Sequence, residues 1–260
     1  MAYKHGAYGE ITKSKAVAAA QADTVLVYIG TAPVHLISGY SAAGIINTPV
    51  RLRNMNEAKS LFGYSADWEN FTLCEAFAEH FNNTVANSGP IYVINVLDPD
   101  TDKGEQVSLS SQDFTGGPVK ISNGHEVIID SVGVTGKVRD TNFSVKYDAE
   151  EDVVVITPIT TLTASETVTY YPIDASGITA SDIIGSVNAD GSSTGLAAIK
   201  QLYTKYNAVT NLIAAPGWSE DPAVYTAMVA ASQKINGHWE AFVIADIPTS
   251  STVDTIAKAK

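Results

Sequence analysis

The sequence predicts an α/β fold, with a mixed, mostly parallel sheet flanked by helices and an inserted all-β domain. Short apolar runs typical of strands buried on both faces alternate with helical patterns toward both ends of the chain. Residues 98–183 show no convincing helix, but carry runs rich in Val, Ile, Thr and Tyr that end at turn signals. We therefore expect an N-terminal arm at 1–23, an α/β domain at 24–99 and 185–260, and the inserted β domain at 100–184.

The N-terminal residues 1–23 combine mixed charge and glycines with little core-forming pattern, which indicates an arm and not a domain. One interpretation is a frayed terminus. The other is a segment that adds a strand to the sheet of a neighbouring subunit. The candidate subunit-contact residues of this arm are Tyr3, Tyr8, Ile11 and Val17.

Three strands are expected in the first part of the α/β domain. Residues 24–30 and 91–97 are apolar runs that predict buried strands. Residues 49–53 follow a long loop and alternate apolar with basic side chains, which is typical of a strand near a sheet edge.

Two helices should separate these strands. Asn54 can cap a short helix that runs to Phe62 and ends at Gly63. A second apolar stripe spans residues 67–85 and includes Cys74. Because Cys74 lies on the apolar face, we interpret it as a small core residue and not as a nucleophile.

The central residues predict strands joined by tight turns. Asn123-Gly124, the strongest short hairpin signal, lies between apolar runs at 119–122 and 125–129. Further strands are expected at 143–147 and 153–157, which flank an acidic turn, and at 167–172.

The last part of the chain predicts a strand, a helix and a parallel strand. A helix with an apolar stripe at 196–206 leads into a strand at 211–215. A second helix should begin near Asp221 or Pro222 and stop at Gly237. The strand at 241–247 should then lie beside the first, buried on both faces. The apolar face of the second helix comprises Val224, Ala227, Met228, Ala231 and Ile235.

Another helix should begin after Pro248. Ser251 and Thr252 are good N-cap candidates, but the chain stops at Lys260. We therefore expect this chain to be a fragment of a longer protein, with further sequence missing at its C-terminus.

The charge and cysteine content exclude several classes of protein. The chain has 16 Lys and Arg against 28 Asp and Glu, a formal net charge of −12. This acidity argues against nucleic acid and anionic membranes as partners. The single cysteine rules out an intramolecular disulfide, and no apolar run approaches the roughly 20 residues of a membrane span. We expect the protein to be made and folded in cytosol.

Motifs for cofactor or metal binding are missing from the sequence. No glycine-rich phosphate-binding pattern follows Gly30 or occurs elsewhere. The acidic run from Asp98 resembles a calcium loop, but Lys103 replaces the required glycine and Leu109 the bidentate glutamate. The five histidines show no metal-ligand spacing. We therefore expect no metal and no cofactor.

A hydrolase could be assembled from Ser219, Asp221 and His238. However, Ser219 lacks the G-x-S-x-G turn that presents a nucleophilic serine, so we interpret Ser219 and Asp221 as helix-capping residues. We predict no catalytic residues. Two alternatives remain open from the residues alone: an α/β hydrolase or nucleotide-binding enzyme, and a cell-surface-binding module carried by the β insertion.

Several runs resemble the contractile tail sheath proteins of bacteriophages and prophages. Residues 211–248 match the core segment of that family, with a strand ending in APGWS, a helix, and a strand ending in DIP. Matching runs occur at 6–10 (GAYGE), 49–63 (PVRLRNMNEAKSLFG) and 182–196 (DIIGSVNADGSSTGL). The resemblance covers most of the chain and is weakest in the β block.

The resemblance implies a subtilisin-like α/β fold without a catalytic triad. It implies six-fold rings of sheath subunits, stacked helically around an inner tail tube, that contract to drive the tube into the host envelope. The other implied partners are the baseplate and the tail terminator, in a virion tail assembled in the bacterial host cytoplasm. The arm at 1–23 would link neighbouring subunits, and the family's C-terminal region would follow Lys260.

We predict that the 260-residue chain by itself is a monomer in solution. Part of the contacts between sheath subunits would come from sequence that it lacks. Light scattering should give a mass close to 27.5 kDa. A stable hexamer would contradict this prediction.

Overall fold

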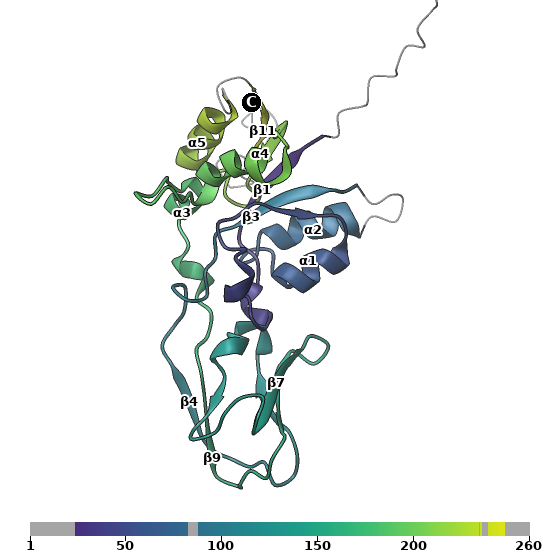
Figure 1. Cartoon of the computed structure of the whole chain (residues 1–260), viewed down its shortest axis with the longest axis vertical. Coiled ribbons are helices and arrows are strands. Elements are labelled where there is room, and N and C mark those ends of the chain that lie inside the picture. Colours follow the sequence, from purple (N-terminus) through teal and green to yellow (C-terminus); the bar gives the residue numbers. More distant parts are fainter. Residues whose placement is uncertain (1–23, 83–87, 234, 236–238, 248–260) are drawn as a thin grey trace, which may run out of the picture.

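The computed structural model describes residues 24–82, 88–233, 235 and 239–247. The molecule is elongated, with an α/β sheet and its helices at one end and a block of β-strands at the other (Figure 1). The candidate contact residues Tyr3, Tyr8, Ile11 and Val17 lie outside the described residues, as does the segment after Ile247.

A five-stranded sheet forms the centre of the α/β part, in the order β11-β10-β1-β3-β2. Parallel pairing joins β1 to β3, β1 to β10, and β10 to β11, whereas β2 is antiparallel to β3. The expected mixed, mostly parallel sheet and the edge position of the second strand are therefore confirmed. The strands are β1 (Leu26–Gly30), β2 (Val50–Leu52), β3 (Ile91–Asn95), β10 (Leu212–Ala214) and β11 (Phe242–Ile244).

Helices lie on both faces of this sheet. Figure 1 shows α1 and α2 on one side of β1 and β3, and the later helices on the other side. Phe62 of α1, Phe77 of α2, Leu202 of α4 and Met228 of α5 are fully buried in one continuous apolar core with the strands. The helices are α1 (Met55–Phe62), α2 (Leu73–Phe81), α3 (Ala180–Ile184), the 3-10 helix η6 (Gly195–Lys200), α4 (Gln201–Tyr206) and α5 (Pro222–Ser232).

Local sequence signals explain where these helices begin and end. The Asn54 side chain accepts a hydrogen bond from the Glu57 amide at the start of α1, and Gly63 ends that helix with a φ of 75°. The Asp221 side chain accepts from the amides of Ala223 and Val224, which caps α5 as predicted.

Two small sheets form the β block. One has the order β4-β9-β6 and the other β5-β8-β7, all with antiparallel pairing. Side chains such as Phe143, Val154, Ile156 and Val168 bury a second apolar core between them. The strands are β4 (Val107–Gln112), β5 (Val119–Ser122), β6 (Gly133–Val134), β7 (Phe143–Asp148), β8 (Val153–Pro158) and β9 (Glu166–Tyr170).

Short 3-10 helices occupy several connections. Two of them interrupt the stretch 31–48, which we expected to be a plain loop. They are η1 (Val34–Leu36), η2 (Ser41–Ala43), η3 (Gly124–Glu126), η4 (Ile129–Ser131) and η5 (Ala175–Gly177).

The hairpin predicted at Asn123-Gly124 is wrong, although the one around the acidic turn, β7 to β8, is confirmed. Strand β5 pairs with β8, and Gly124 is the first residue of η3. A Cβ on Gly124 would lie 2.6 Å from the carbonyl carbon of Val153. The glycine is therefore needed for close approach to the end of β8, and not for a two-residue turn.

Several predicted boundaries also need correction. The second helix begins at Leu73 and not at 67, and the helix over 196–206 starts as the 3-10 helix η6. Helix α5 ends at Ser232, five residues before the expected stop at Gly237, which lies outside the described residues. A short helix, α3, already begins at Ala180, inside the stretch where no helix was expected.

The junction between the sheet and the β block is built around His35. This side chain is fully buried, and its Nε2 donates to the carbonyl oxygen of His125 at 2.7 Å. Close by, Asp130 accepts from the Ser38 hydroxyl at 2.9 Å and the Gly39 amide at 2.6 Å. Leu36 packs in the core of the β block. The loop after β1 therefore joins the two parts of the molecule.

His35 should make the stability of the fold depend on pH. Burial lowers the pKa of His35 to about 4, and its Nδ1 has no hydrogen-bond partner among the described residues. The unfolded chain takes up this proton near pH 6.5, whereas the folded chain does not until about pH 4. Between these values the unfolded state binds more protons, so stability must fall as the pH falls.

We predict that His35 alone removes about 3 kcal/mol from the free energy of unfolding between pH 7 and pH 4. The variants His35→Gln and His35→Phe should both show a flatter pH dependence than the wild type in urea titrations at several pH values. Equal pH dependence in all three proteins would contradict the prediction.

Candidate interaction surface at the open edge of the sheet

Strand β11 is an edge of the five-stranded sheet, with β10 as its strand partner among the described residues. The Phe242 amide donates to the carbonyl oxygen of Asn211, so Phe242 turns its backbone groups toward β10. In a parallel pair the next residue turns its groups the other way, which leaves the N–H and C=O of Val243 facing outward. An edge of this kind can pair with a strand of another chain.

The side chains of β11 contradict the prediction that this strand is buried on both faces. Val243 packs against the main core, but Phe242 is 77% and Ile244 48% exposed. The register aligns these two residues with Leu212 and Ala214 of β10. An exposed apolar surface therefore follows one face of the strand to the sheet edge.

The carboxyl ends of β10 and β11 are tied together by Ser219 and Asp246. The Ser219 hydroxyl donates to Asp246 Oδ2 at 2.9 Å and accepts from the Asp246 amide at 2.8 Å. The Gly217 amide donates to the same carboxylate oxygen at 2.9 Å. Ser219 therefore bonds across to the end of the next strand and does not cap α5, which corrects its predicted role.

This arrangement does not resemble a hydrolase site. Ser219 is 3% exposed, and its described hydrogen bonds go to Asp246, not to a histidine. The Asp221 side chain accepts the capping hydrogen bonds at the start of α5, and His238 lies outside the described residues. The described residues therefore place no histidine within hydrogen-bond reach of the Ser219 hydroxyl, as its activation would require.

Cys74 is confirmed as a core residue. Its side chain is fully buried, and burial raises the pKa of the thiol to about 12. The thiol therefore stays protonated at neutral pH, and a protonated thiol is a poor nucleophile.

One polar cluster with a histidine lies in the β block. His125 Nδ1 lies 2.6 Å from Asp152 Oδ2, and the Tyr147 hydroxyl donates to Asp152 Oδ1 at 3.1 Å. Burial, followed by the charge of Asp152, raises the pKa of Tyr147 to about 12. These contacts fasten η3 to the β7–β8 hairpin.

Neither a metal-binding cluster nor a membrane-spanning helix occurs in the part of the chain that the structure describes. No group of three or more His, Cys, Asp or Glu side chains there could hold a metal ion. None of the described helices has the length and hydropathy needed to span a bilayer.

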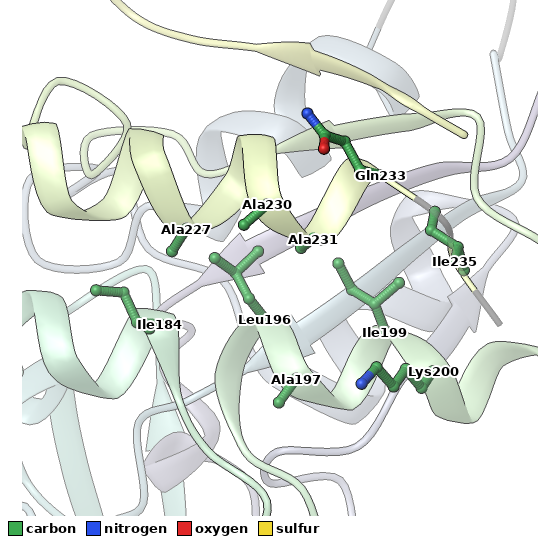
Figure 2. Close-up of a pocket in the computed structure, with 10 residues that line it drawn as sticks. All are labelled: Ile184, Leu196, Ala197, Ile199, Lys200, Ala227, Ala230, Ala231, Gln233 and Ile235. Atoms are coloured by element: carbon green, nitrogen blue, oxygen red, sulfur yellow. The ribbon is translucent and has the colours of Figure 1, made fainter. Parts of the chain in front are cut away.

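An apolar groove lies between α5 and η6, on the face opposite α1 and α2. In Figure 2, Leu196 and Ile199 point from η6 toward Ala227, Ala230 and Ala231 of α5. The small alanine side chains leave a volume of about 340 Å³. Because apolar atoms dominate its lining, the groove suits an apolar side chain, and Lys200 and Gln233 are the polar residues that line it.

Sequence reasoning missed the residues that define this surface. The apolar run 241–247 predicted a strand correctly, but a run without polar alternation cannot distinguish a central strand from an uncovered edge. Asp246 was part of a matching motif, yet nothing in its spacing pointed to Ser219. The predicted contact residues Tyr3, Tyr8, Ile11 and Val17 are not among the described residues.

Comparison with known proteins confirms the resemblance noted in the sequence. No family model matches the chain. A tail sheath protein of Burkholderia phage BcepMu is 28% identical over 241 residues, which are 88% of this chain and 45% of that protein. A putative prophage major tail sheath protein of Pseudomonas aeruginosa strain UCBPP-PA14 is 40% identical over 81 residues, 31% of this chain and 20% of that protein. The chain thus spans less than half the length of either relative.

We predict that Ser219→Ala lowers the free energy of unfolding by about 1–2 kcal/mol, because it removes hydrogen bonds to the Asp246 carboxylate and amide. Chemical denaturation measures the loss. Ser165→Ala, at an exposed serine in the β block, is the control and should change stability by less than about 0.5 kcal/mol. Equal effects of the two substitutions would rule out a structural role for the Ser219 contacts.

Proposed function

We propose that this chain, a relative of tail sheath proteins, is a structural subunit of a contractile phage-type tail. In this proposal its copies polymerise as stacked six-fold rings around an inner tail tube and contract to drive the tube into the host envelope. The observation that carries the proposal is the similarity to a phage tail sheath protein along 88% of the chain.

The open edge of β11 supports polymerisation by strand addition. The arm at 1–23 of one subunit, through Tyr3, Tyr8, Ile11 and Val17, would pair with the outward N–H and C=O of Val243 in a neighbour. Such a contact is head to tail, so repetition yields a helical tube instead of a closed dimer. Backbone hydrogen bonds would keep subunits linked while they move.

Contraction requires subunits that move as rigid bodies. The buried His35 contact and the apolar packing of Leu36 support this, since they join the loop after β1 to the β block. Energy would be stored when the extended sheath assembles and released without ATP. The chain would therefore need no catalytic residue and no cofactor.

The proposal includes a domain division and a set of partners. Residues 24–99 and 185–260 would form a subtilisin-like sheath domain and residues 100–184 an inserted β domain, which its separate apolar core supports. The partners would be other sheath subunits, the inner tail tube protein, the baseplate and the tail terminator. Assembly would take place in the host cytoplasm, and the product would be a virion tail.

The location of the protein tests this proposal. Antibodies raised against the purified chain should label the outside of contractile tails along their whole length in electron micrographs of lysates from the host that encodes it. Labelling of a tail fibre or of the bare tube, or tails without label, would overturn the proposal.

We predict that Val243→Pro, introduced into the phage or prophage gene that encodes this chain, abolishes assembly of the sheath. Proline removes the outward N–H of β11 but not the bond from Phe242 to Asn211, so the isolated chain should still fold. The measurement is the fraction of sheathed tails in electron micrographs.

The matched control is Val243→Ala, which shortens the same side chain but keeps the N–H. With this variant, the fraction of sheathed tails should be the same as in the wild type. Normal sheaths in the proline variant, with circular dichroism showing both purified chains folded, would exclude strand addition at this edge.

A further inference from the structure

The five-stranded sheet has a second edge at β2, on the side opposite β11. Among the described residues the neighbour of β2 is β3, which runs antiparallel to it and places Tyr92 opposite Arg51. In an antiparallel pair, alternate residues turn their backbone groups toward the neighbouring strand, and the residues between them turn theirs outward. Another strand can pair with such an edge where the outward groups are free.

Side chains of the same chain occupy the outward amides of this edge. The Arg51 amide donates to the Tyr206 hydroxyl at 3.3 Å, so Arg51 belongs to the outward set. The same hydroxyl donates to the carbonyl oxygen of Pro49 at 3.2 Å, and proline has no amide hydrogen. Two residues after Arg51, the Arg53 amide donates to Glu57 Oε2 at 2.9 Å. The outward amides of 49–53 are therefore satisfied without another strand.

The ring of Tyr206 is held in place independently of its hydroxyl. Tyr206 is the last residue of α4, which packs over this part of the sheet. Its ring meets the Tyr92 ring edge-on at a centroid distance of 5.3 Å. The guanidinium of Arg51 and the ammonium of Lys205 each lie 5.8 Å from the centre of the Tyr206 ring. Removal of the hydroxyl alone should therefore leave the ring where it is.

The two edges of the sheet differ in this respect. At β11, no side chain of the described residues forms a hydrogen bond with the backbone of Val243. The sequences differ as well, because β11 reads FVI whereas the β2 edge reads PVRLR over 49–53. Proline and charged side chains are features by which edge strands resist pairing with other chains. Within the described residues, β2 is thus a closed edge and β11 an open one.

We propose that Tyr206 is a specificity residue that closes the β2 edge, so that another chain can add a strand to this sheet at β11 but not at β2. A subunit with one accepting edge has one place for a head-to-tail contact, whereas two accepting edges would also permit contacts of the wrong direction. The closure is a property of the single folded chain. Its use in sheath assembly rests on the proposed function.

Hydrogen exchange of the purified 260-residue chain tests the closure. Tyr206→Phe keeps the ring but removes the partner of the Arg51 amide. In dilute protein, NMR should show this amide exchanging roughly tenfold faster than in the wild type, because its hydrogen bond is lost. The control is Tyr203→Phe on the same helix, which removes an exposed hydroxyl and should leave the exchange rate of Arg51 unchanged.

Self-association tests what the closure prevents. With its outward groups freed, β2 of one Tyr206→Phe chain should pair with β2 of a second copy about a two-fold axis. Sedimentation velocity should therefore show dimers of Tyr206→Phe at concentrations where the wild type and Tyr203→Phe show none. At those concentrations the exchange of the Arg51 amide should slow again, since the partner strand covers it.

Three outcomes would overturn the proposal. The first is an Arg51 amide that exchanges equally fast in Tyr206→Phe and in the wild type. The second is a Tyr206→Phe chain, folded by circular dichroism, that forms no more dimer than the wild type. The third is dimers whose formation leaves the exchange of Arg51 unaltered. All three are measured on the isolated chain, so they are separate from the labelling of tails that tests the proposed function.

Discussion

Both faces of a parallel sheet must be hidden from water, and this constraint governs the structure. The strands β1, β3 and β10 have almost no polar side chains with which to face solvent, so helices have to cover them. Helices α1 and α2 do so on one side, and η6, α4 and α5 on the other. Where the described helices end, at β11, Phe242 and Ile244 stay exposed.

The edge of the sheet and the junction with the β block differ in what holds them. At the edge, hydrogen bonds between Ser219 and Asp246 hold the carboxyl ends of β10 and β11 next to each other. At the junction, the buried His35 and the apolar Leu36 exclude water from the contact. Both sets of contacts join segments that are far apart in the sequence.

Several small buried polar groups are committed to structural contacts. Asn95 accepts from the amides of Ala32 and Leu97 and donates to the Leu97 carbonyl, so its side chain organises the loop after β1. Cys74 is sealed in the core, and Ser219 is committed to Asp246. Polar side chains at the ends of the strands, where α/β enzymes place their catalytic groups, are here used to hold the backbone.

The sequence by itself determined the element types and the resemblance. Apolar periodicity, the Asn54 and Asp221 caps and the stop at Gly63 are local properties, so the helices and strands of the α/β part followed from them. The tertiary structure determined the strand pairing and the exposure of side chains, which the local sequence pattern does not specify. It paired β5 with β8 instead of closing a turn at Gly124, and it left β11 at an edge. It also brought Asp246 to Ser219. Strand order and exposure depend on contacts between residues far apart in the sequence. A run of apolar residues has the same sequence whether the strand it forms has a neighbouring strand on both sides or lies at an edge of the sheet.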